Sequence, residues 1–292
     1  MRLPGHAQLP TGVDEQLTPL GEVGVSYGRG AVHGPPRLSA AELIHGAVMD
    51  NTVLITGASR GIGSACAQMF VDAGWNAVLV ARSRQLVDFA AGLGRAVAVV
   101  GDVADPAVNE EAVQAAISRF GRLDHVIGNA GVTLSKTVDE TTEADMERLF
   151  AINVKALIYL AQAIHGPLAK TRGSYTIMAS NKGLVGQRHS PIYCATKGAA
   201  VQIARALALD WAPEGIRVNA ICPGVIRTPM VDEFVSALPD PEAVMEDYAR
   251  TQPLGRLGTA EEVASVALFL ASAGAGFVNG VALPVDAGFT AQ

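Results

Sequence analysis

The stretch TVLITGASRGIG, residues 52–63, joins a short β-branched run directly to a glycine-rich turn. Glycines at positions 57, 61 and 63 let the backbone bend sharply and approach a ligand closely. The residues that follow read as a helix, whose free N–H groups and positive dipole end would face a pyrophosphate. A strand before the turn, a helix after it and a further strand are the context that a dinucleotide-binding loop requires. The stretch therefore predicts a nucleotide-binding α/β fold.

Strand and helix signals alternate along the chain after residue 49. The strand candidates are short apolar or β-branched runs without polar alternation, which suits strands buried on both faces. We therefore predict an α/β fold of the Rossmann type, a doubly wound, seven-stranded parallel sheet flanked by helices on both faces. The expected strands are 52–56, 76–81, 96–101, 123–128, 174–179, 216–221 and 281–286, and the expected helices 61–73, 84–91, 106–119, 142–168, 191–212 and 260–271.

Composition narrows the classes of partner. The net charge of −6 and the lack of a basic cluster argue against nucleic acid, which needs a basic face. Cys66, Cys194 and Cys222 form no CxxC pair, so a disulfide framework and a zinc site are not indicated, no metal is expected, and a reducing cytoplasm is the simplest location. We find neither a secretory signal nor an apolar run of about eighteen residues, and therefore expect no membrane span.

The first 48 residues differ in composition from the rest of the chain. They hold eight glycines and five prolines and have no sustained hydrophobic period. Two interpretations are open: a disordered extension, or a mis-annotated start whose true initiator is Met49. Residues 49–292 show no second change in composition and no internal repeat, so we predict a single domain there.

The segment SNKGLVGQRHSPIYCATK, residues 180–197, contains Ser180, Tyr193 and Lys197. Tyr193 and Lys197 lie four residues apart, which places them on one face of a helix. A Tyr-x-x-x-Lys pair is common by chance, and each residue taken singly is equally well explained as a surface or capping group. The pattern therefore has to be interpreted together with the motifs in the rest of the chain.

The motifs occur in an order that resembles the short-chain dehydrogenase/reductase family in its single-domain form, and in particular 3-oxoacyl-carrier-protein-reductase-like members. The resemblance covers essentially all of 49–292. It departs from the family pattern at Gly128, where the family has a first Asn, and at Ala287, where it has Gly. The matching motifs are TGASRGIG at 56–63, GDV at 101–103, GNAG at 128–131, INV at 152–154, Ser180 with Tyr193 and Lys197, CPGVIRTPM at 222–230 and PVDAG at 284–288.

The resemblance implies a nicotinamide dinucleotide cofactor and assigns its contacts residue by residue. The expected cofactor-binding residues are Gly57, Ser59, Arg60, Gly61, Ile62, Gly63, Arg82, Asp102, Val103, Asn129, Ala130, Gly131, Tyr193, Lys197, Pro223, Gly224, Val225 and Thr228.

The end of the second strand favours NADP(H) over NAD(H). A site that prefers NAD usually ends this strand with an acidic residue for the ribose 2′-hydroxyl. Ala81 stands there instead, followed by Arg82, and Arg60 in the glycine loop would reach the same 2′-phosphate. If both arginines were ordinary surface residues, NAD(H) would remain possible.

Four residues form the expected catalytic set: Asn153, Ser180, Tyr193 and Lys197. A carbonyl that receives hydride gains negative charge on oxygen, so it needs a proton donor and a stabilising hydrogen bond. Tyr193 is the expected general acid/base, and a nearby Lys197 ammonium together with the positive nicotinamide would lower its pKa from about 10. Ser180 would hold the substrate oxygen, and the resemblance gives Lys197 a bond to the ribose and Asn153 a water chain to Lys197.

The resemblance also implies a substrate lid over about 229–258, where two short helical pieces flank PDP. Lys182, Gln187 and Met230 are the expected substrate contacts. Lys182 and its loop neighbour Arg188 would favour a polar or anionic substrate, although a solvated loop explains them as well.

The sequence thus predicts an oxidoreductase that interconverts a secondary alcohol and a ketone by hydride transfer. An NAD-dependent alcohol dehydrogenase of the same family is the alternative within enzymes. A non-catalytic nucleotide-binding sensor is the alternative of another class, although such a protein would be expected to lose Tyr193 or Lys197. The expected partner is a small-molecule ketone or alcohol, and the resemblance implies a homotetramer or homodimer. The substrate itself cannot be read from the motifs.

Overall fold

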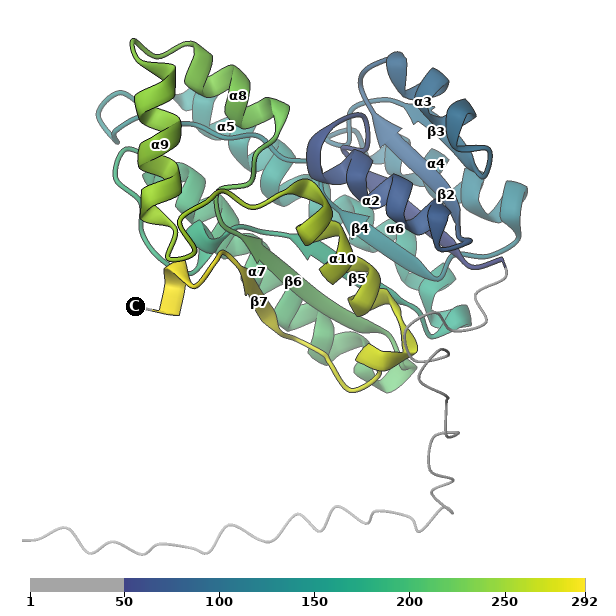
Figure 1. The fold of residues 1–292 in the computed structure, drawn as a ribbon. Helices are drawn as coiled ribbons and strands as arrows, with labels where there is room; N and C mark the ends of the chain where they lie inside the picture. Colours follow the sequence, from purple (N-terminus) through teal and green to yellow (C-terminus); the bar gives the residue numbers. More distant parts are fainter. Residues whose placement is uncertain (1–49, 292) are drawn as a thin grey trace, which may run out of the picture. The chain divides into compact units, whose positions relative to one another are not determined.

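The computed structural model describes residues 50–291 (Figure 1). The expectations for residues 1–48 lie outside the described residues. Within the described range, every predicted strand and helix is present, with bounds that agree within two residues except in the longest predicted helix.

Seven parallel strands form one sheet, in the order β3-β2-β1-β4-β5-β6-β7. The predicted fold class is confirmed by this order. Neighbouring strands in the sheet are consecutive in the chain except at one place. There β1, which lies between β2 and β4, pairs with β4. The bounds are β1 Thr52–Thr56, β2 Asn76–Ala81, β3 Ala96–Val100, β4 His125–Gly128, β5 Ser174–Met178, β6 Arg217–Pro223 and β7 Ala282–Val285.

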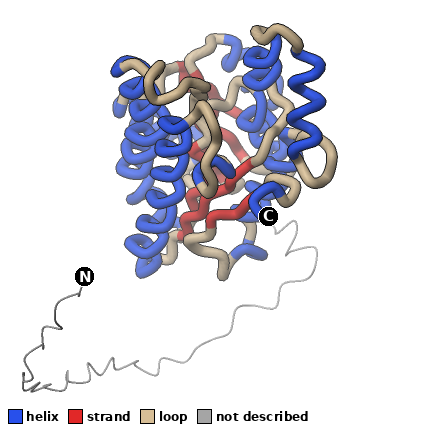
Figure 2. Tube along the Cα trace, turned by 90° about the vertical axis from the view of Figure 1, so that its left-hand side faces the viewer, coloured by secondary structure: helices blue, strands red, loops and turns tan. Residues whose placement is uncertain are grey.

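Helices cover both faces of this sheet, and Figure 2 shows the strands enclosed between them. The faces are distinguished by which buried side chains pack together. One face carries α2 (Gly61–Asp72), α3 (Gln85–Leu93) and α10 (Ala260–Ala271), and the other carries α4 (Pro106–Phe120), α6 (Ala156–Thr171) and α7 (Pro191–Trp211).

Alternate residues of the strands supply the two hydrophobic cores. In β1, Leu54 packs under α4, α6 and α7, whereas Val53 and Ile55 pack under α2, α3 and α10. All five residues of β1 are buried, since a central parallel strand has helices on both sides. The continuous apolar runs seen in the sequence have this cause.

The break in strand order positions the functional site. The chain leaves β1 toward one edge of the sheet and returns at β4 to proceed toward the other edge. Loops on the two sides therefore diverge, and a crevice opens at the carboxyl ends of β1 and β4, which is where doubly wound folds bind ligands. Two further helices, α8 (Pro229–Ser236) and α9 (Pro241–Thr251), follow β6 in the predicted lid segment.

The predicted helix 142–168 is not a regular α-helix. It consists of α5 (Glu143–Phe150), a π-helical turn η1 (Ala151–Lys155) and α6. A hydrophobic period does not reveal one inserted residue, because the apolar face continues on both sides of such a turn.

The helical segment Glu143–Thr171 is long and apolar enough to cross a membrane, with a mean hydropathy of 1.3, although no membrane span was expected from the sequence. Residues of α6 such as Leu160 and Ile164 pack in the core and account for this hydropathy.

His125 is a titratable side chain buried in the core, far from the carboxyl edge of the sheet. Its ring stacks on Phe70 at 5.6 Å, and Nδ1 lies 2.8 Å from the Ser174 hydroxyl. Nε2 is buried without a hydrogen-bond partner. Burial, with the charge of Arg217 as a lesser cause, lowers the pKa of His125 from 6.5 to about 3. The imidazole is therefore neutral in the folded protein.

We expect this group to make stability fall as pH falls. The unfolded chain takes up a proton on His125 near pH 6.5, whereas the folded protein resists that proton down to about pH 3. Between those limits the free energy of unfolding should decrease by up to about 1.4 kcal/mol per pH unit from this residue. Urea unfolding of His125→Asn across this range should show a shallower pH dependence than the wild type. His189→Asn, at an exposed site, is the matched control and should follow the wild type; equal slopes in all three proteins would refute the expectation.

Candidate active site

A cavity of about 460 Å³ opens at the carboxyl edge of the sheet. Its walls come from the ends of β4, β5 and β6, from the start of α7, and from α8 and α9. A second cavity, of about 800 Å³, shares Gly57, Ala130 and Gly131 with the first and extends along the ends of β2 and β3. The two together provide room for an elongated ligand that crosses the strand break.

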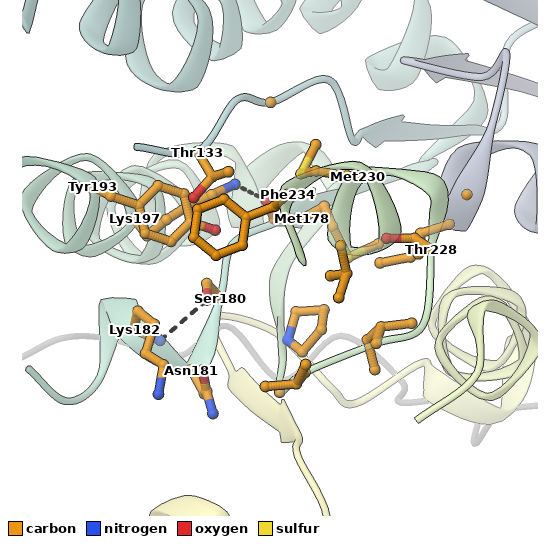
Figure 3. Close-up of a pocket in the computed structure, with 18 of the residues that line it drawn as sticks. Thr133, Met178, Ser180, Asn181, Lys182, Tyr193, Lys197, Thr228, Met230 and Phe234 are labelled. Carbon is orange, nitrogen blue, oxygen red and sulfur yellow. Dashed lines mark hydrogen bonds between the residues drawn. The ribbon is translucent and has the colours of Figure 1, made fainter. Parts of the chain in front are cut away.

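Ser180, Tyr193 and Lys197 all line the first cavity (Figure 3). Ser180 ends the segment after β5, and its hydroxyl caps a short 3₁₀ turn, Asn181–Gly183, by accepting a hydrogen bond from the Lys182 N–H at 3.1 Å. Pro191 occupies the first turn of α7, so Tyr193 sits within that turn and Lys197 one turn later. The helical register predicted from the sequence is therefore present, and it brings the three side chains to one wall.

The Lys197 ammonium is fixed by the protein backbone. Nζ donates to the Met178 carbonyl at 2.9 Å and lies 6.0 Å from the centre of the Tyr193 ring. Burial lowers the pKa of Lys197 to about 8. Burial also raises the pKa of Tyr193, while the Ser180 hydroxyl acts in the opposite direction with a smaller effect. In the protein alone, desolvation of the phenolate therefore dominates the Tyr193 pKa, whereas the lowering was expected from Lys197 together with the positive nicotinamide.

Asn153 lies in the π-helical turn and is buried. Its amide both donates to the Val132 carbonyl and accepts from the Val132 N–H, each at 2.9 Å, and it donates to the Thr196 hydroxyl at 3.1 Å. A Cβ built on Gly131 would lie 3.4 Å from both the Asn153 Oδ1 and the Lys197 Nζ. Asn153 therefore ties the loop after β4 to α7 directly behind Lys197, a positioning role.

The glycine loop passes closely under the residues that follow β4. Gly57 has φ +66° and Gly61 has φ +61°, a backbone region that favours glycine. A Cβ on Gly63 would lie 2.3 Å from the Gly57 carbonyl oxygen, so no side chain fits there. The Asn129 amide donates to the carbonyls of Thr56 and Gly57 at 2.9 and 3.1 Å and holds the turn in place.

The second cavity is lined by the two arginines as well as by apolar side chains. Arg82 follows β2, with Nη1 3.9 Å from the Asp102 carboxylate, and its side chain is two-thirds exposed. Arg60 forms an ion pair with Glu233 of α8, which connects the glycine loop to the predicted lid. Arg60 and Arg82 both line this cavity, as do their acidic neighbours Glu233 and Asp102, whereas β2 itself ends in Ala81.

Most of the predicted site residues come together at these two cavities. Gly63 and Asn153 do not line either cavity, but they contact residues that do: Gly63 packs against Gly57, and Asn153 bonds to Val132. The predicted residues that line the first or second cavity are Gly57, Ser59, Arg60, Gly61, Ile62, Arg82, Asp102, Val103, Asn129, Ala130, Gly131, Ser180, Lys182, Gln187, Tyr193, Lys197, Pro223, Gly224, Val225, Thr228 and Met230.

Several lining residues were not predicted individually. Tyr248 comes from α9, where the amphipathic pattern of the lid offered a general signal. Phe289, three residues from the end of the chain, also lines the first cavity, and nothing in its sequence neighbourhood indicated this. Asn181 lines the same cavity but was passed over between Ser180 and Lys182.

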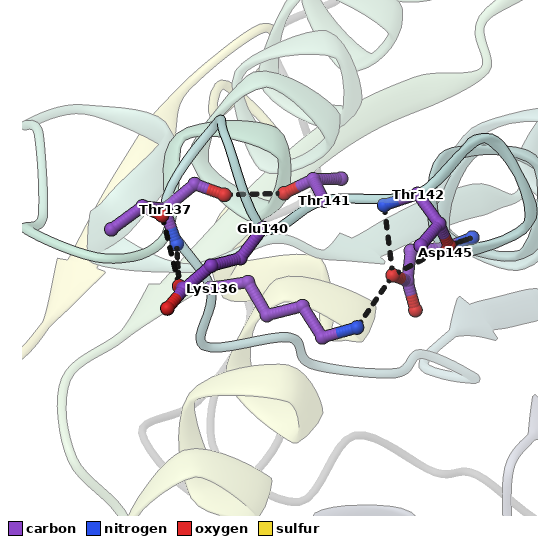
Figure 4. A network of polar contacts seen from close by, with 6 residues as sticks. All are labelled: Lys136, Thr137, Glu140, Thr141, Thr142 and Asp145. Carbon is purple, nitrogen blue, oxygen red and sulfur yellow. Dashed lines mark hydrogen bonds and ion pairs between the residues drawn. The ribbon is translucent and has the colours of Figure 1, made fainter.

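The loop from β4 to α5 completes the wall with Thr133 and Ser135, and polar contacts fix its outer part (Figure 4). Lys136 forms an ion pair with Asp145 at 2.7 Å, and Asp145 also closes the capping box of α5. These contacts, with the Lys136 bond as the largest cause, lower the pKa of Asp145 to about 2. The Glu140 carboxylate accepts from the N–H and hydroxyl of Thr137. The loop is thus anchored at α5 on one side and at Asn153 on the other.

Residues 57–290 match the family model described as enoyl-(acyl carrier protein) reductase. The meso-2,3-butanediol dehydrogenase of Serratia marcescens is 37% identical over 246 residues, which cover 83% of this chain and 96% of that protein. The chain belongs to the short-chain dehydrogenase/reductase family. It is an NAD(P)-dependent oxidoreductase that acts on CH–OH groups and interconverts a secondary alcohol and a ketone by hydride transfer.

Solved short-chain dehydrogenases/reductases have the same architecture. L-Sorbose reductase from Gluconobacter frateurii, solved in complex with NADPH and L-sorbose, matches with a TM-score of 0.80 at 30% identity, over 84% of this chain and 98% of that one. Levodione reductase matches with a TM-score of 0.80 at 31% identity, over 84% of this chain and 99% of that one.

The residues of the two cavities fit the nicotinamide dinucleotide that short-chain dehydrogenases/reductases use. α2 begins at Gly61 with no side chain capping its first turn, so its N–H groups remain available to a pyrophosphate. A Cβ would lie 2.9 Å from the Ala130 Cα at Gly57 and 2.3 Å from the Gly57 carbonyl oxygen at Gly63, so neither position admits a side chain, and Gly61 has a positive φ that favours glycine. Within residues 50–291, no group of three or more His, Cys, Asp or Glu side chains is placed to hold a metal ion.

We expect Gly63→Ala to disrupt this cradle. The added methyl would meet the Gly57 carbonyl at 2.3 Å, so the loop must move away from α2. The variant should lose about 1–3 kcal/mol of stability and bind cofactor at least ~10-fold more weakly, measured by thermal unfolding and by fluorescence titration with NADPH.

Gly92→Ala is the matched control, because it lies within α3 with no atom near its Cβ. It should gain about 0.5–1 kcal/mol and keep cofactor affinity. Wild-type cofactor affinity in Gly63→Ala would contradict the role given to the loop.

Proposed function

We propose that the protein is an NADP(H)-dependent reductase and dehydrogenase of small-molecule ketones and secondary alcohols. The observation that carries the cofactor preference is the end of β2, where Ala81 stands in place of a carboxylate and Arg82 follows. Arg82 and Arg60 both line the cavity beside it. Two guanidinium groups favour a phosphate at this position, since each can form charge-assisted hydrogen bonds. The L-sorbose reductase neighbour, whose complex contains NADPH, supports the same preference.

The alternative within the same enzyme class is an NAD(H)-dependent enzyme. It is favoured by one observation: both arginines already have acidic neighbours, Arg82 with Asp102 and Arg60 with Glu233. These neighbours compete with a phosphate for the guanidinium groups. Both pairs are largely exposed, however, and exposed ion pairs contribute at most about 1 kcal/mol, less than a charge-assisted phosphate contact.

The chemistry follows from the residues of the first cavity. When bound, the nicotinamide cofactor supplies hydride to the substrate carbon in reduction and accepts it in oxidation. Tyr193 donates its phenolic proton to the substrate oxygen as negative charge develops there, and Ser180 donates a hydrogen bond to the same oxygen. Burial raises the pKa of Tyr193, so the phenol is held in the protonated form that reduction requires. In oxidation the roles reverse, and Tyr193 accepts the hydroxyl proton.

Lys197 and Asn153 fix the surroundings of the proton donor Tyr193. The Lys197 ammonium donates to the Met178 carbonyl at the end of β5. This bond fixes its position 6.0 Å from the centre of the Tyr193 ring. Asn153 holds the loop after β4 and the Thr196 hydroxyl, so it sets the position of the α7 turn that carries both Tyr193 and Lys197. The wall is preorganised by buried contacts with the protein backbone, which lowers reorganisation during the reaction.

Tyr193→Phe should abolish turnover and leave cofactor binding intact. The substitution removes the phenolic proton while keeping the ring that forms the wall. We expect a loss of at least ~100-fold in kcat, the range that a general acid contributes. Tyr159→Phe in α6 is the matched control and should keep wild-type activity. Turnover by Tyr193→Phe at the wild-type rate would refute the mechanism.

Arg82→Ala should weaken NADPH selectively. A lost charge-assisted contact to the 2′-phosphate should reduce kcat/KM for NADPH by about 10–100-fold, with kcat/KM for NADH nearly unchanged. Initial rates with both cofactors on a panel of ketones measure this. Arg84→Ala, two residues on and outside both cavities, is the control. A wild-type preference for NADH would support the alternative.

We also propose that the protein is cytoplasmic and forms a homotetramer or homodimer. The free cysteines, Cys66 and Cys222 buried and Cys194 partly exposed, are compatible with a reducing compartment. Phe269 and Phe277 near the end of α10 are 48% and 105% exposed, as at surfaces that associate. Sedimentation velocity and cell fractionation test these two points, and a monomer or a secreted protein would contradict them.

A further inference from the structure

Two neighbouring nitrogen groups occupy the wall of the first cavity beside Ser180. Asn181 and Lys182 form the 3₁₀ turn that Ser180 caps, and both line the cavity. Figure 3 shows their side chains extending in the same direction, away from Tyr193 and Lys197. They are separated from the proton donor by Ser180, which holds the reacting oxygen. A group bound by them would therefore belong to another part of the same substrate.

The Asn181 amide has an unused donor. Asn181 is 1% exposed, and its Nδ2 is buried with no hydrogen-bond partner. A buried polar group without a partner costs stability, and one that lines a cavity recovers that cost when a ligand supplies the missing bond. This nitrogen points to an acceptor that the protein itself does not provide.

The Lys182 ammonium is held in place but is not neutralised. Nζ lies 4.0 Å from the centre of the Phe289 ring, which restricts an otherwise flexible side chain. No carboxylate in the part of the chain that the structure describes lies within ion-pair distance of it. Burial lowers the pKa of Lys182, which is the expected effect on a cation without a paired anion.

The nearby acidic groups are already engaged. The Asp286 carboxylate accepts from the N–H groups of Gly288 and Thr290 and from the Thr290 hydroxyl. Asp247, the one carboxylate among the described residues that line this cavity, lies 3.7 Å from Arg250. Asp286 acts on Lys182 through its charge and raises the Lys182 pKa by less than burial lowers it, but neither carboxylate forms an ion pair with Lys182, so the ammonium stays available to an anion.

We propose that Asn181 and Lys182 form a carboxylate-binding subsite and that the substrate is an oxo acid or the corresponding hydroxy acid. The carboxylate accepts from the Lys182 ammonium and the Asn181 amide, while the carbonyl to be reduced lies between Ser180 and Tyr193. This deepens the proposed function and rests on it for the reacting end of the substrate. The apolar residues Met178, Val225 and Phe234 line the remainder of the cavity and suit a short carbon chain.

The test compares short straight-chain oxo acids with their primary amides, which keep the shape and remove the charge. The wild type should prefer the acid. Lys182→Met should reduce kcat/KM for the acid by about 10–100-fold, the range of a lost hydrogen bond to a charged group. It should do so through KM, because the ammonium is remote from the reacting oxygen, and kcat/KM for the amide should change less than about two-fold.

Two further variants separate local contact from general charge and from folding. Asn181→Leu should lower the preference for the acid without loss of thermal stability, since the amide it removes has no partner. Arg188→Met removes a cation of the same loop that is exposed and does not line the cavity, and it should keep the wild-type preference. An equal loss in Arg188→Met would overturn the subsite.

A binding measurement keeps this proposal independent of turnover. Calorimetry with the saturated carboxylic acid, which lacks the oxo group, is performed on the enzyme with oxidised cofactor, alongside its amide. Binding of the acid that weakens about ten-fold or more in Lys182→Met supports the subsite even if no ketone is reduced, a result that would count against the proposed function alone. Equal binding of acid and amide by the wild type, or acid binding unchanged in Lys182→Met, would overturn it.

Discussion

The pairing of β1 with β4 is the constraint on which the whole site depends. These strands are neighbours in the sheet but are separated in the chain by two strands and three helices. Because the chain turns toward opposite edges after β1 and after β4, their loops diverge and leave a crevice at the carboxyl ends. The glycine loop after β1 and the Asn129 segment after β4 meet across that crevice, where the Asn129 amide holds the carbonyls of Thr56 and Gly57.

Contacts between side chains and backbone then set the positions of the reacting groups. The carbonyl of Met178 holds Lys197, and the N–H and carbonyl of Val132 hold Asn153. Each bond joins a strand end or loop to a helix that packs against the sheet. Backbone groups do not change rotamer, so the wall of the cavity is rigid where the proton is transferred. The opposite side of the cavity is formed by α8 and α9, which line it with side chains such as Phe234.

The motifs of the sequence located most of the candidate site because they are local. The glycine loop, the Asp102 turn and the Tyr193–Lys197 pair each lie within one turn or one helix, so spacing alone fixes their geometry. The π-helical turn around Asn153 was not predicted, because an inserted residue leaves the hydrophobic pattern unchanged. The burial that raises the pKa of Tyr193 in the protein alone was not visible for a related reason: a sequence displays charged neighbours but not desolvation.

The sequence by itself determined the order of strands and helices, the glycine loop and the helix that carries Tyr193 and Lys197. These follow from short-range steric and hydrogen-bonding preferences. Tertiary structure alone decided that Phe289 lies against Lys182, that Asn181 is buried without a partner, and that Arg60 meets Glu233 of the lid. Such contacts join residues far apart in the chain, and they depend on how the layers pack, which no local pattern specifies.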